Sequence, residues 1–200
     1  RAMLPALPTI GRSNELAVKV LLSTCTRIGE LTMAEWSHID LERRESTIPP
    51  ELSKNSKRFV IPLVDPVVGW FVDLQTVSFA SRFVLPVRTR FRHSDGDRPM
   101  SAATLNAAIN RLCLALGDKC RRFTPHDLRS TARSHLGAMG VDLLVAERCL
   151  NHTPGGLVAV YDQHDYLSER RKALDLWARF IVACESGSDR NVIPLLRAVT

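Results

Sequence analysis

The stretch Thr124–Gly140 reads TPHDLRSTARSHLGAMG and predicts a helix with both ends marked. Thr124 is a capping residue followed by proline at the first helical position, and Gly140 follows the last turn. His126 and Arg129 are three residues apart, which places them on one helix face. Near a helix N-terminus, free backbone N–H groups and the dipole favour a bound anion. The pair therefore predicts an anion site with a proton-transfer group, unless this face is simply solvated.

Helical periodicity continues on both sides of this stretch. Apolar residues recur every three or four positions, and Ser13 and Ser101 are suitable capping residues for two of the helices. The predicted helices cover residues 12–25, 30–36, 65–79, 101–116, 124–139, 142–150, 158–163 and 168–181.

Between residues 39 and 63 the pattern changes to short strands. Segments 39–41 and 47–49 are separated by the charged residues 42–45, and segment 58–63 follows as their partner. The polar link 52–57 is turn-forming and places Lys54 near a hairpin tip. The predicted fold class is mainly α with a small antiparallel β-sheet, an α+β arrangement.

Composition indicates a globular chain with excess positive charge. Of 200 residues 45% are hydrophobic, enough to bury a core, and no stretch reaches the roughly 18 to 20 apolar residues of a membrane span. The start lacks the apolar region of a signal peptide. The net charge of +6 suits a polyanionic partner. Five cysteines without a C-x-x-C pair favour a reduced intracellular protein, expected to be cytoplasmic.

Several kinds of catalytic site have no support in the sequence. There is no Gly-rich nucleotide-binding loop, no zinc-binding pattern of histidines or cysteines and no serine hydrolase motif. Arg27 lies in a predicted turn between two helices, where pairing with Glu30 to hold the turn would explain it. His152 follows a helix end, where it could be a cap, and Tyr161 nine residues later could be a half-buried core residue.

In chain order, however, these elements resemble a known family. The segment Thr26–Leu31, then Lys54, then His126-x-x-Arg129, then Leu150-Asn151-His152 and Tyr161 resemble the catalytic domain of tyrosine recombinases, the phage integrase family. The resemblance covers residues 10–182, and segments 161–166 and 169–174 are most similar to prophage-type integrases. Asn151 departs from the pattern, because the family more often has glycine there.

The resemblance implies a nucleophile and two proton-transfer groups. Tyr161 would attack a DNA phosphodiester and form a 3′-phosphotyrosine, with Lys54 protonating the departing 5′-oxygen and His126 assisting proton transfer at the tyrosine. Tyr166 lies beside Asp165, where an acidic neighbour disfavours the phenolate, so we expect it to pack its ring instead.

The same resemblance implies how the phosphate is held. Arg27 and Arg129 would bind its two non-bridging oxygens, and His152 would hydrogen-bond it. Glu30 would orient Arg27 or its turn. No metal and no cofactor are expected.

The implied partner is double-stranded DNA at attachment sites, bound by a homotetramer, with DNA-bending or excision factors as accessories. The implied role is integration or excision of a prophage or mobile element in the bacterial nucleoid. Further DNA contacts are expected from exposed cations on a loop and ahead of the catalytic helix, namely Arg88, Arg90, Arg92, Arg98, Arg121 and Arg122.

The expected organisation is a linker remnant at residues 1–11, the catalytic domain at 12–184 and a tail at 185–200. The tail contains the apolar cluster Val192–Leu196 and is expected to dock on a neighbouring subunit. Two alternatives are a type IB topoisomerase-like strand transferase and an inactive DNA-binding module derived from a recombinase.

Overall fold

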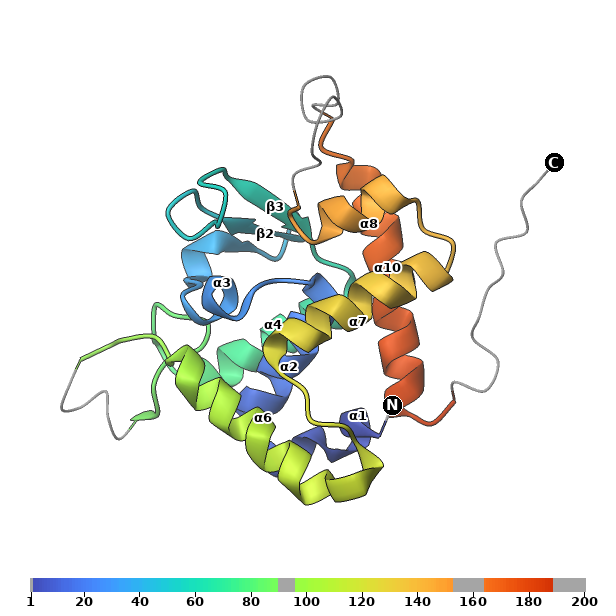
Figure 1. The fold of residues 1–200 in the computed structure, drawn as a ribbon. Helices are drawn as coiled ribbons and strands as arrows, with labels where there is room; N and C mark the ends of the chain where they lie inside the picture. The colour runs from blue at the N-terminus through green and yellow to red at the C-terminus, as the bar shows by residue number, and fades with distance from the viewer. Residues whose placement is uncertain (1, 90–95, 153–163, 189–200) are drawn as a thin grey trace.

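Helix α2 (Arg12–Thr24) runs through the middle of the fold in the computed structural model, which describes residues 2–89, 96–152 and 164–188 (Figure 1). Its residues from Asn14 to Thr24 are all buried. Helices α4 (Asp65–Ser78), α7 (Pro125–Ala138) and α10 (Leu167–Glu185) pack against it. One polar contact fixes α10 to α2, because the Trp177 indole N–H donates to the Leu22 carbonyl at 2.8 Å.

Shorter helices complete the helical part. Met3–Ala6 forms α1, and Leu7–Ile10 forms the 3₁₀ helix η1. Both pack against α6 (Ala102–Leu116), which continues into η3 (Gly117–Lys119). Helix α3 (Ile28–Thr32) and η2 (Trp36–His38) lead to the sheet, and α8 (Leu143–Cys149) follows α7.

The N-terminal residues are part of the packed core. Leu4, Leu7 and Ile10 are buried in the same apolar cluster as the central helix. The interpretation of residues 1–11 as the end of a linker stays a prediction, while residues 3–10 are helical and contribute to the core of the domain.

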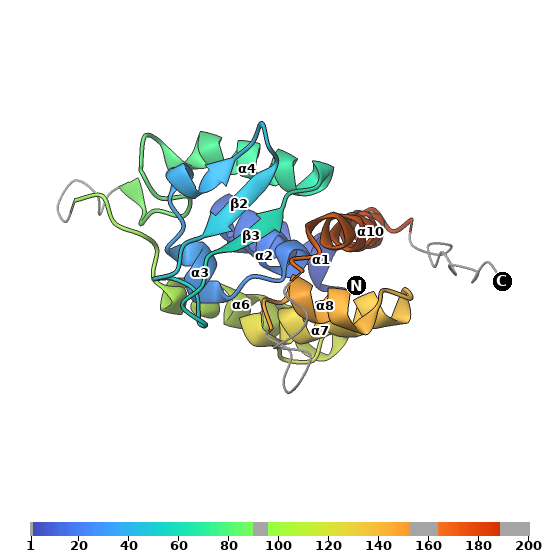
Figure 2. The same ribbon diagram turned by 90° about the horizontal axis from the view of Figure 1, so that it is seen from above.

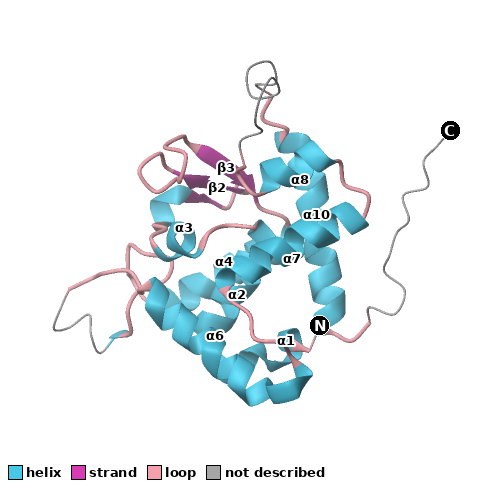
Figure 3. Cartoon of the chain, viewed as in Figure 1, coloured by secondary structure: helices cyan, strands magenta, loops and turns pink. Residues whose placement is uncertain are grey.

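Three short strands form one antiparallel sheet in the order β1 (Ile39–Asp40), β2 (Glu45–Ile48) and β3 (Phe59–Pro62). Ile48 pairs with Phe59 at the inner end of the β2–β3 hairpin, and residues 49–58 link the two strands. The view from above shows the sheet and α4 on one side of α2, with α6, α7 and α8 on the other (Figure 2). The predicted class, mainly α with a small antiparallel sheet, is confirmed (Figure 3).

The predicted helix starts were correct where a side chain supplies the cap. Ser101 Oγ accepts from the Thr104 N–H at 3.3 Å. Ser13 does not cap α2; Gly11 does, with a φ of +87° that favours glycine. The last helix begins at Leu167 rather than Ser168, after Tyr166 in a left-handed conformation.

The central helix buries an ion cluster that joins it to α10. Lys19 Nζ lies 2.8 Å from a Glu15 carboxylate oxygen and 2.6 Å from one of Glu185. Burial disfavours the charged form of both side chains, but the pairing raises the pKa of Lys19 and lowers that of Glu15.

All five cysteines are free. Within the described residues, no helix has the length and apolar character needed to cross a membrane.

Candidate active site

Arg129 is a buried arginine whose guanidinium joins three parts of the chain. The helix that carries it begins at Pro125, where Thr124 Oγ1 accepts from the Asp127 N–H and the Asp127 carboxylate accepts from the Thr124 N–H at 2.8 Å. One turn later the side chain of Arg129, a residue only 5% exposed, donates to the Cys25 carbonyl and, at 2.8 Å, to the Leu150 carbonyl.

The electrostatics of Arg129 suit an anion. Burial lowers its pKa from the ordinary value, and the positive charge of Arg27 lowers it further. A buried arginine whose charge is disfavoured by a nearby cation is stabilised when an anion binds beside it.

Arg27 occupies the turn between α2 and α3, as the sequence predicted. Its backbone N–H donates to one Glu30 carboxylate oxygen at 2.7 Å, and its guanidinium donates to the other at 2.8 Å. Glu30 is buried, whereas the Arg27 side chain is 26% exposed. Glu30 therefore holds both the turn and the side chain, and leaves part of the guanidinium accessible.

His152 lies beside Arg129, and a contact with Glu147 on the other side of its ring fixes the orientation of the ring. Its Nε2 lies 3.5 Å from Arg129 Nη2, and its Nδ1 lies 2.6 Å from Glu147 Oε2. An ionised carboxylate only accepts hydrogen bonds, so Nδ1 carries the proton and Nε2 faces the arginine. Glu147 is itself paired with Arg133.

Glu147 is a site residue that the sequence analysis missed. Although burial favours its neutral form, hydrogen bonds from Arg133 and His152 lower its pKa. The available signal was its position five residues before His152 at the end of a predicted helix. That spacing is not a recognised side-chain pair on a straight helix; it works because the chain turns after Cys149.

Lys54 lies on the link between β2 and β3, as predicted, and is exposed. Its neighbours Ser53 and Asn55 hydrogen-bond to Asn151, the residue before His152. The hairpin that carries the lysine is thus tied to the same turn that carries the histidine.

His126 is exposed in the first turn of α7, while Arg129 on the same helix is buried. Arg121 and Arg122 are exposed just before that helix. Among the described residues, the structure gives His126 no hydrogen bond to Arg27, Arg129 or His152. The hydrogen bonds of the described residues therefore join Arg129 to His152 and to the Cys25 carbonyl, two residues before Arg27, and they tie the Lys54 hairpin to Asn151, whereas His126 is not included.

Several predicted residues lie outside the described residues: Tyr161, Arg90, Arg92 and the apolar cluster of the tail.

The segment that begins at residue 164 is firmly anchored. Arg170 is fully buried and donates to the Val60 carbonyl at 2.7 Å and to the carbonyl and carboxylate of Asp165 at 2.9 and 2.7 Å. Tyr166 packs against the core, with its ring edge-on to His164.

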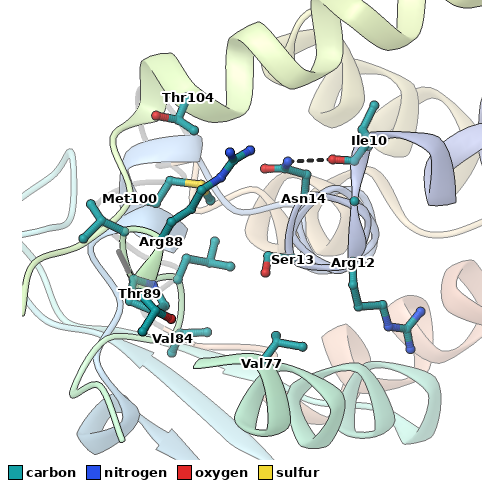
Figure 4. A pocket seen from close by; sticks show the side chains of 14 residues that line it. Ile10, Arg12, Ser13, Asn14, Val77, Val84, Arg88, Thr89, Met100 and Thr104 are labelled. Carbon is teal, nitrogen blue, oxygen red and sulfur yellow. Dashed lines mark hydrogen bonds between the residues drawn. The ribbon is translucent and has the colours of Figure 1, made fainter. Parts of the chain in front are cut away.

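Two of the predicted DNA-contacting arginines can be placed at the edge of the fold. Arg98 and Arg88 are exposed on the segments that flank residues 90–95. Arg88 also lines a cavity of about 450 Å³ between the starts of α2 and α6 and the end of α4, and extends across it toward Asn14 (Figure 4). Among the residues that the structure describes, none of those implied to be catalytic lines that cavity.

The described residues contain no group of three or more histidine, cysteine, aspartate or glutamate side chains that could hold a metal ion. The chemistry that the arrangement can supply is cationic. Two guanidinium groups and an imidazole can surround an oxyanion, and a lysine on an anchored hairpin can donate a proton beside it.

Comparison with known proteins identifies relatives across most of the chain. A family profile described as "Phage integrase family" matches residues 2–167. Prophage integrase IntA of Escherichia coli (strain K12) is 32% identical over 84% of this chain and 38% of its own length. Prophage integrase IntZ of the same strain is 30% identical over 90% of this chain and 42% of its own length. The chain thus spans about two fifths of these relatives.

Solved structures share the fold at low sequence identity. The integrase from mycobacterium phage Brujita superposes with a TM-score of 0.64 at 16% identity, covering 86% of this chain and 55% of its own. XerA recombinase gives a TM-score of 0.62 at 20% identity, covering 85% and 60%. The Tn1549 transposon integrase, in complex with transposon right end DNA, gives 0.59 at 16% identity, covering 85% and 62%.

Proposed function

Because the chain belongs to the phage integrase family, we propose that it is the catalytic domain of a site-specific DNA recombinase. It cleaves and rejoins DNA strands through a 3′-phosphotyrosine intermediate. The observation that carries the proposal is the position of the buried Arg129, which lies 3.5 Å from the His152 ring and close enough to Arg27 for the positive charge of Arg27 to lower its pKa.

The reaction is a transesterification. The hydroxyl oxygen of Tyr161 bonds to phosphorus, and the bond from phosphorus to the 5′-oxygen breaks. The tyrosine proton leaves with assistance from His126, and Lys54 gives a proton to the 5′-oxygen, so a 5′-hydroxyl is released. The 3′-phosphotyrosine keeps the energy of the phosphodiester, and attack by another 5′-hydroxyl rejoins the strand without ATP.

The arginines stabilise the charge that builds on the two non-bridging oxygens. Arg129 is already held by two backbone carbonyls, so little reorganisation is needed when the phosphate binds. Arg27 is fixed by Glu30 in the same way. A phosphate oxygen only accepts hydrogen bonds, so His152 binds it with Nε2 protonated, and Glu147 then partners the charge of the ring.

Outside the catalytic site, exposed positively charged side chains make further contacts with DNA. The exposed cations Arg88, Arg98, Arg121 and Arg122, together with Arg90 and Arg92, contact backbone phosphates of attachment-site DNA. The active assembly is a homotetramer on DNA, its C-terminal tail docking on the neighbouring subunit, with accessory DNA-bending or excision factors. It acts in the bacterial cytoplasm at the nucleoid, integrating or excising a prophage or mobile element.

Covalent trapping tests the proposal. A pool of duplexes with randomised sequence and a nick close to the centre is incubated with the chain and then denatured in detergent. After cleavage, the short fragment beyond the nick diffuses away and cannot be rejoined, so protein–DNA adducts accumulate. We expect adducts with the unsubstituted chain, enriched in particular sequences, and none with Tyr161→Phe.

Other outcomes assign other functions. DNA binding without any adduct would favour the inactive DNA-binding module. Adducts with no sequence preference, together with relaxation of supercoiled plasmid, would favour a type IB topoisomerase-like activity.

A further inference from the structure

A closed ring of hydrogen bonds joins the Lys54 hairpin to the turn before His152. Asn151 Nδ2 donates to Ser53 Oγ at 3.2 Å, and Ser53 Oγ donates to Asn55 Oδ1 at 2.7 Å. Asn55 Nδ2 donates to Asn151 Oδ1 at 3.1 Å, which closes the ring. The three residues come from segments almost 100 positions apart in the chain, as the separations of 96 and 98 show.

The direction of each bond in the ring is determined by the backbone. The N–H of Lys57 can only donate, and it donates to Asn55 at 3.2 Å, so the atom it meets is the Asn55 carbonyl oxygen. The Asn55 amide nitrogen must then face Asn151, and the Asn151 amide nitrogen must face Ser53. Each of the three bonds in the ring then joins one donor to one acceptor.

Two features of the structure suit asparagine at position 151, the backbone conformation and the hydrogen bonds of the side chain. Its φ of +52° is left-handed, a conformation that asparagine tolerates and glycine adopts most easily. Glycine would satisfy the backbone equally well, but it has no amide with which to reach the hairpin. The side chain therefore supplies something beyond the turn.

The position of the ring connects it to the proposed catalytic groups. Lys54 lies between two members of the ring in sequence. Asn151 lies between Leu150, whose carbonyl accepts from Arg129, and His152. The ring therefore fixes the backbone on both sides of the lysine relative to the segment that holds the phosphate-binding groups.

We infer that Asn151 is a positioning residue that sets the Lys54 hairpin for protonation of the 5′-oxygen; this inference rests on the proposed function. A lysine has a long, flexible side chain, and proton donation requires it to be within hydrogen-bond reach of the leaving oxygen. Anchoring the backbone at both neighbouring residues narrows the volume that the ammonium group explores.

The test compares two nicked substrates, one with the normal 5′-oxygen and one with sulfur in that bridging position. A thiol ionises at about pH 8.5, far more readily than an alcohol, so a thiolate departs without needing a proton. Loss of a proton donor is therefore rescued by sulfur, whereas general damage to the site is not. Lys54→Ala serves as the reference for that pattern.

Asn151→Gly keeps the left-handed turn and removes the ring. We expect it to cleave the oxygen substrate at least about tenfold more slowly than the unsubstituted chain, since small misplacements of a reacting group have effects of this size or larger. On the sulfur substrate its rate should return to within about twofold of the unsubstituted chain. Ser56→Gly is the matched control, because Ser56 also has a positive φ in the same hairpin and is no part of the ring.

Ser53→Ala provides a second, smaller removal of the same ring. We expect it to show the same rescue by sulfur, and the double variant with Asn151→Gly to be no slower than the slower single variant. Unchanged rates on the oxygen substrate, or equal slowing on both substrates, would overturn the inference. Failure of the unsubstituted chain to cleave either substrate would instead overturn the proposed function, and with it the premise of the inference.

Discussion

His152 Nδ1 lies 2.6 Å from Glu147 Oε2, so a carboxylate on the last turns of α8 fixes the ring of the histidine that follows that helix. The His152 side chain is 44% exposed, and within the described part of the chain its ring contacts Glu147 at 2.6 Å and Arg129 at 3.5 Å. The carboxylate selects which ring nitrogen faces Arg129 and the phosphate.

Glu147→Gln should slow cleavage in the nicked-duplex assay by about tenfold or more, a loss typical of removing the outer partner of a functional histidine. Glutamine retains the shape and an acceptor oxygen, but not the charge that partners a protonated ring. Asp175→Asn, which removes an i,i+4 ion pair with Arg179 on α10, is the matched control and should retain full activity. Equal rates for Glu147→Gln and the unsubstituted chain would show that the contact has no catalytic role.

The same carboxylate makes stability depend on acidity. Its pKa is lower in the folded chain than its usual value of 4.5, so the folded state releases this proton more readily than the unfolded state. The stabilisation is present above the usual value and is lost as the pH falls through the folded pKa. Urea unfolding between about pH 5.5 and pH 3 should therefore show a smaller loss of unfolding free energy for Glu147→Gln than for the unsubstituted chain. Parallel losses would contradict this assignment.

Substitution by lysine should destabilise the fold more at Arg129 than at Arg27. Lysine at position 129 keeps the charge but cannot reach the carbonyls of both Cys25 and Leu150, so we expect a loss of about 2 to 3 kcal/mol in unfolding free energy. Cleavage should fall by about 100-fold or more for either arginine. Arg27→Lys, with a more exposed side chain, should lose under about 1 kcal/mol. Comparable destabilisation of both variants would contradict the structural role given to Arg129.

Arg170 should contribute strongly to the stability of the fold, whereas its neighbour Arg171 should not. Its fully buried guanidinium joins β3 to Asp165, so Arg170→Met should lower the unfolding free energy by about 3 kcal/mol or more. Arg171, partly exposed with longer contacts of 3.3 Å to two carbonyls, is the control, and Arg171→Ala should cost under about 1 kcal/mol. Denaturant unfolding measures both, and similar losses for the two variants would contradict the assignment.

Strand cleavage should proceed in EDTA at the rate seen in magnesium. Two arginines, a lysine and two histidines are proposed to supply the positive charge that divalent ions provide at other phosphoryl-transfer sites. The measurement is adduct formation on the nicked duplex with and without chelator. Complete loss of adducts in EDTA, restored by added magnesium, would contradict the proposed chemistry.

Local patterns were sufficient to predict most of the fold. The period of apolar residues gave α2, α4, α6 and α7 within one or two residues, and Thr124 and Ser101 marked two helix starts because their caps lie within the same few residues. Ser13 failed because Gly11, with its positive φ, begins the helix first.

The site was predicted less completely, for a physical reason. The order of motifs in the chain indicated Arg27, Lys54, Arg129 and His152, but the contacts that position them join distant segments. The bonds from Asn151 to Asn55 and from Arg129 to the Leu150 carbonyl depend on how α7, α8 and the hairpin pack, which no local pattern contains. The sequence showed Asn151 only as a departure from the family pattern, because its side-chain partners lie almost 100 residues earlier.

The most direct test of the central claim is to identify the tyrosine that becomes linked to DNA. A phenol has a pKa of about 10 and needs cationic surroundings to attack phosphorus. Tyr161 follows His152 by nine residues, whereas Tyr166 caps α10 and packs against the core beside His164. Trapped adducts are digested with protease and nuclease, and the modified peptide is sequenced by mass spectrometry. We predict a nucleotide on Tyr161, its loss in Tyr161→Phe and its retention in Tyr166→Phe; a nucleotide on Tyr166 with Tyr161 unmodified would contradict the account.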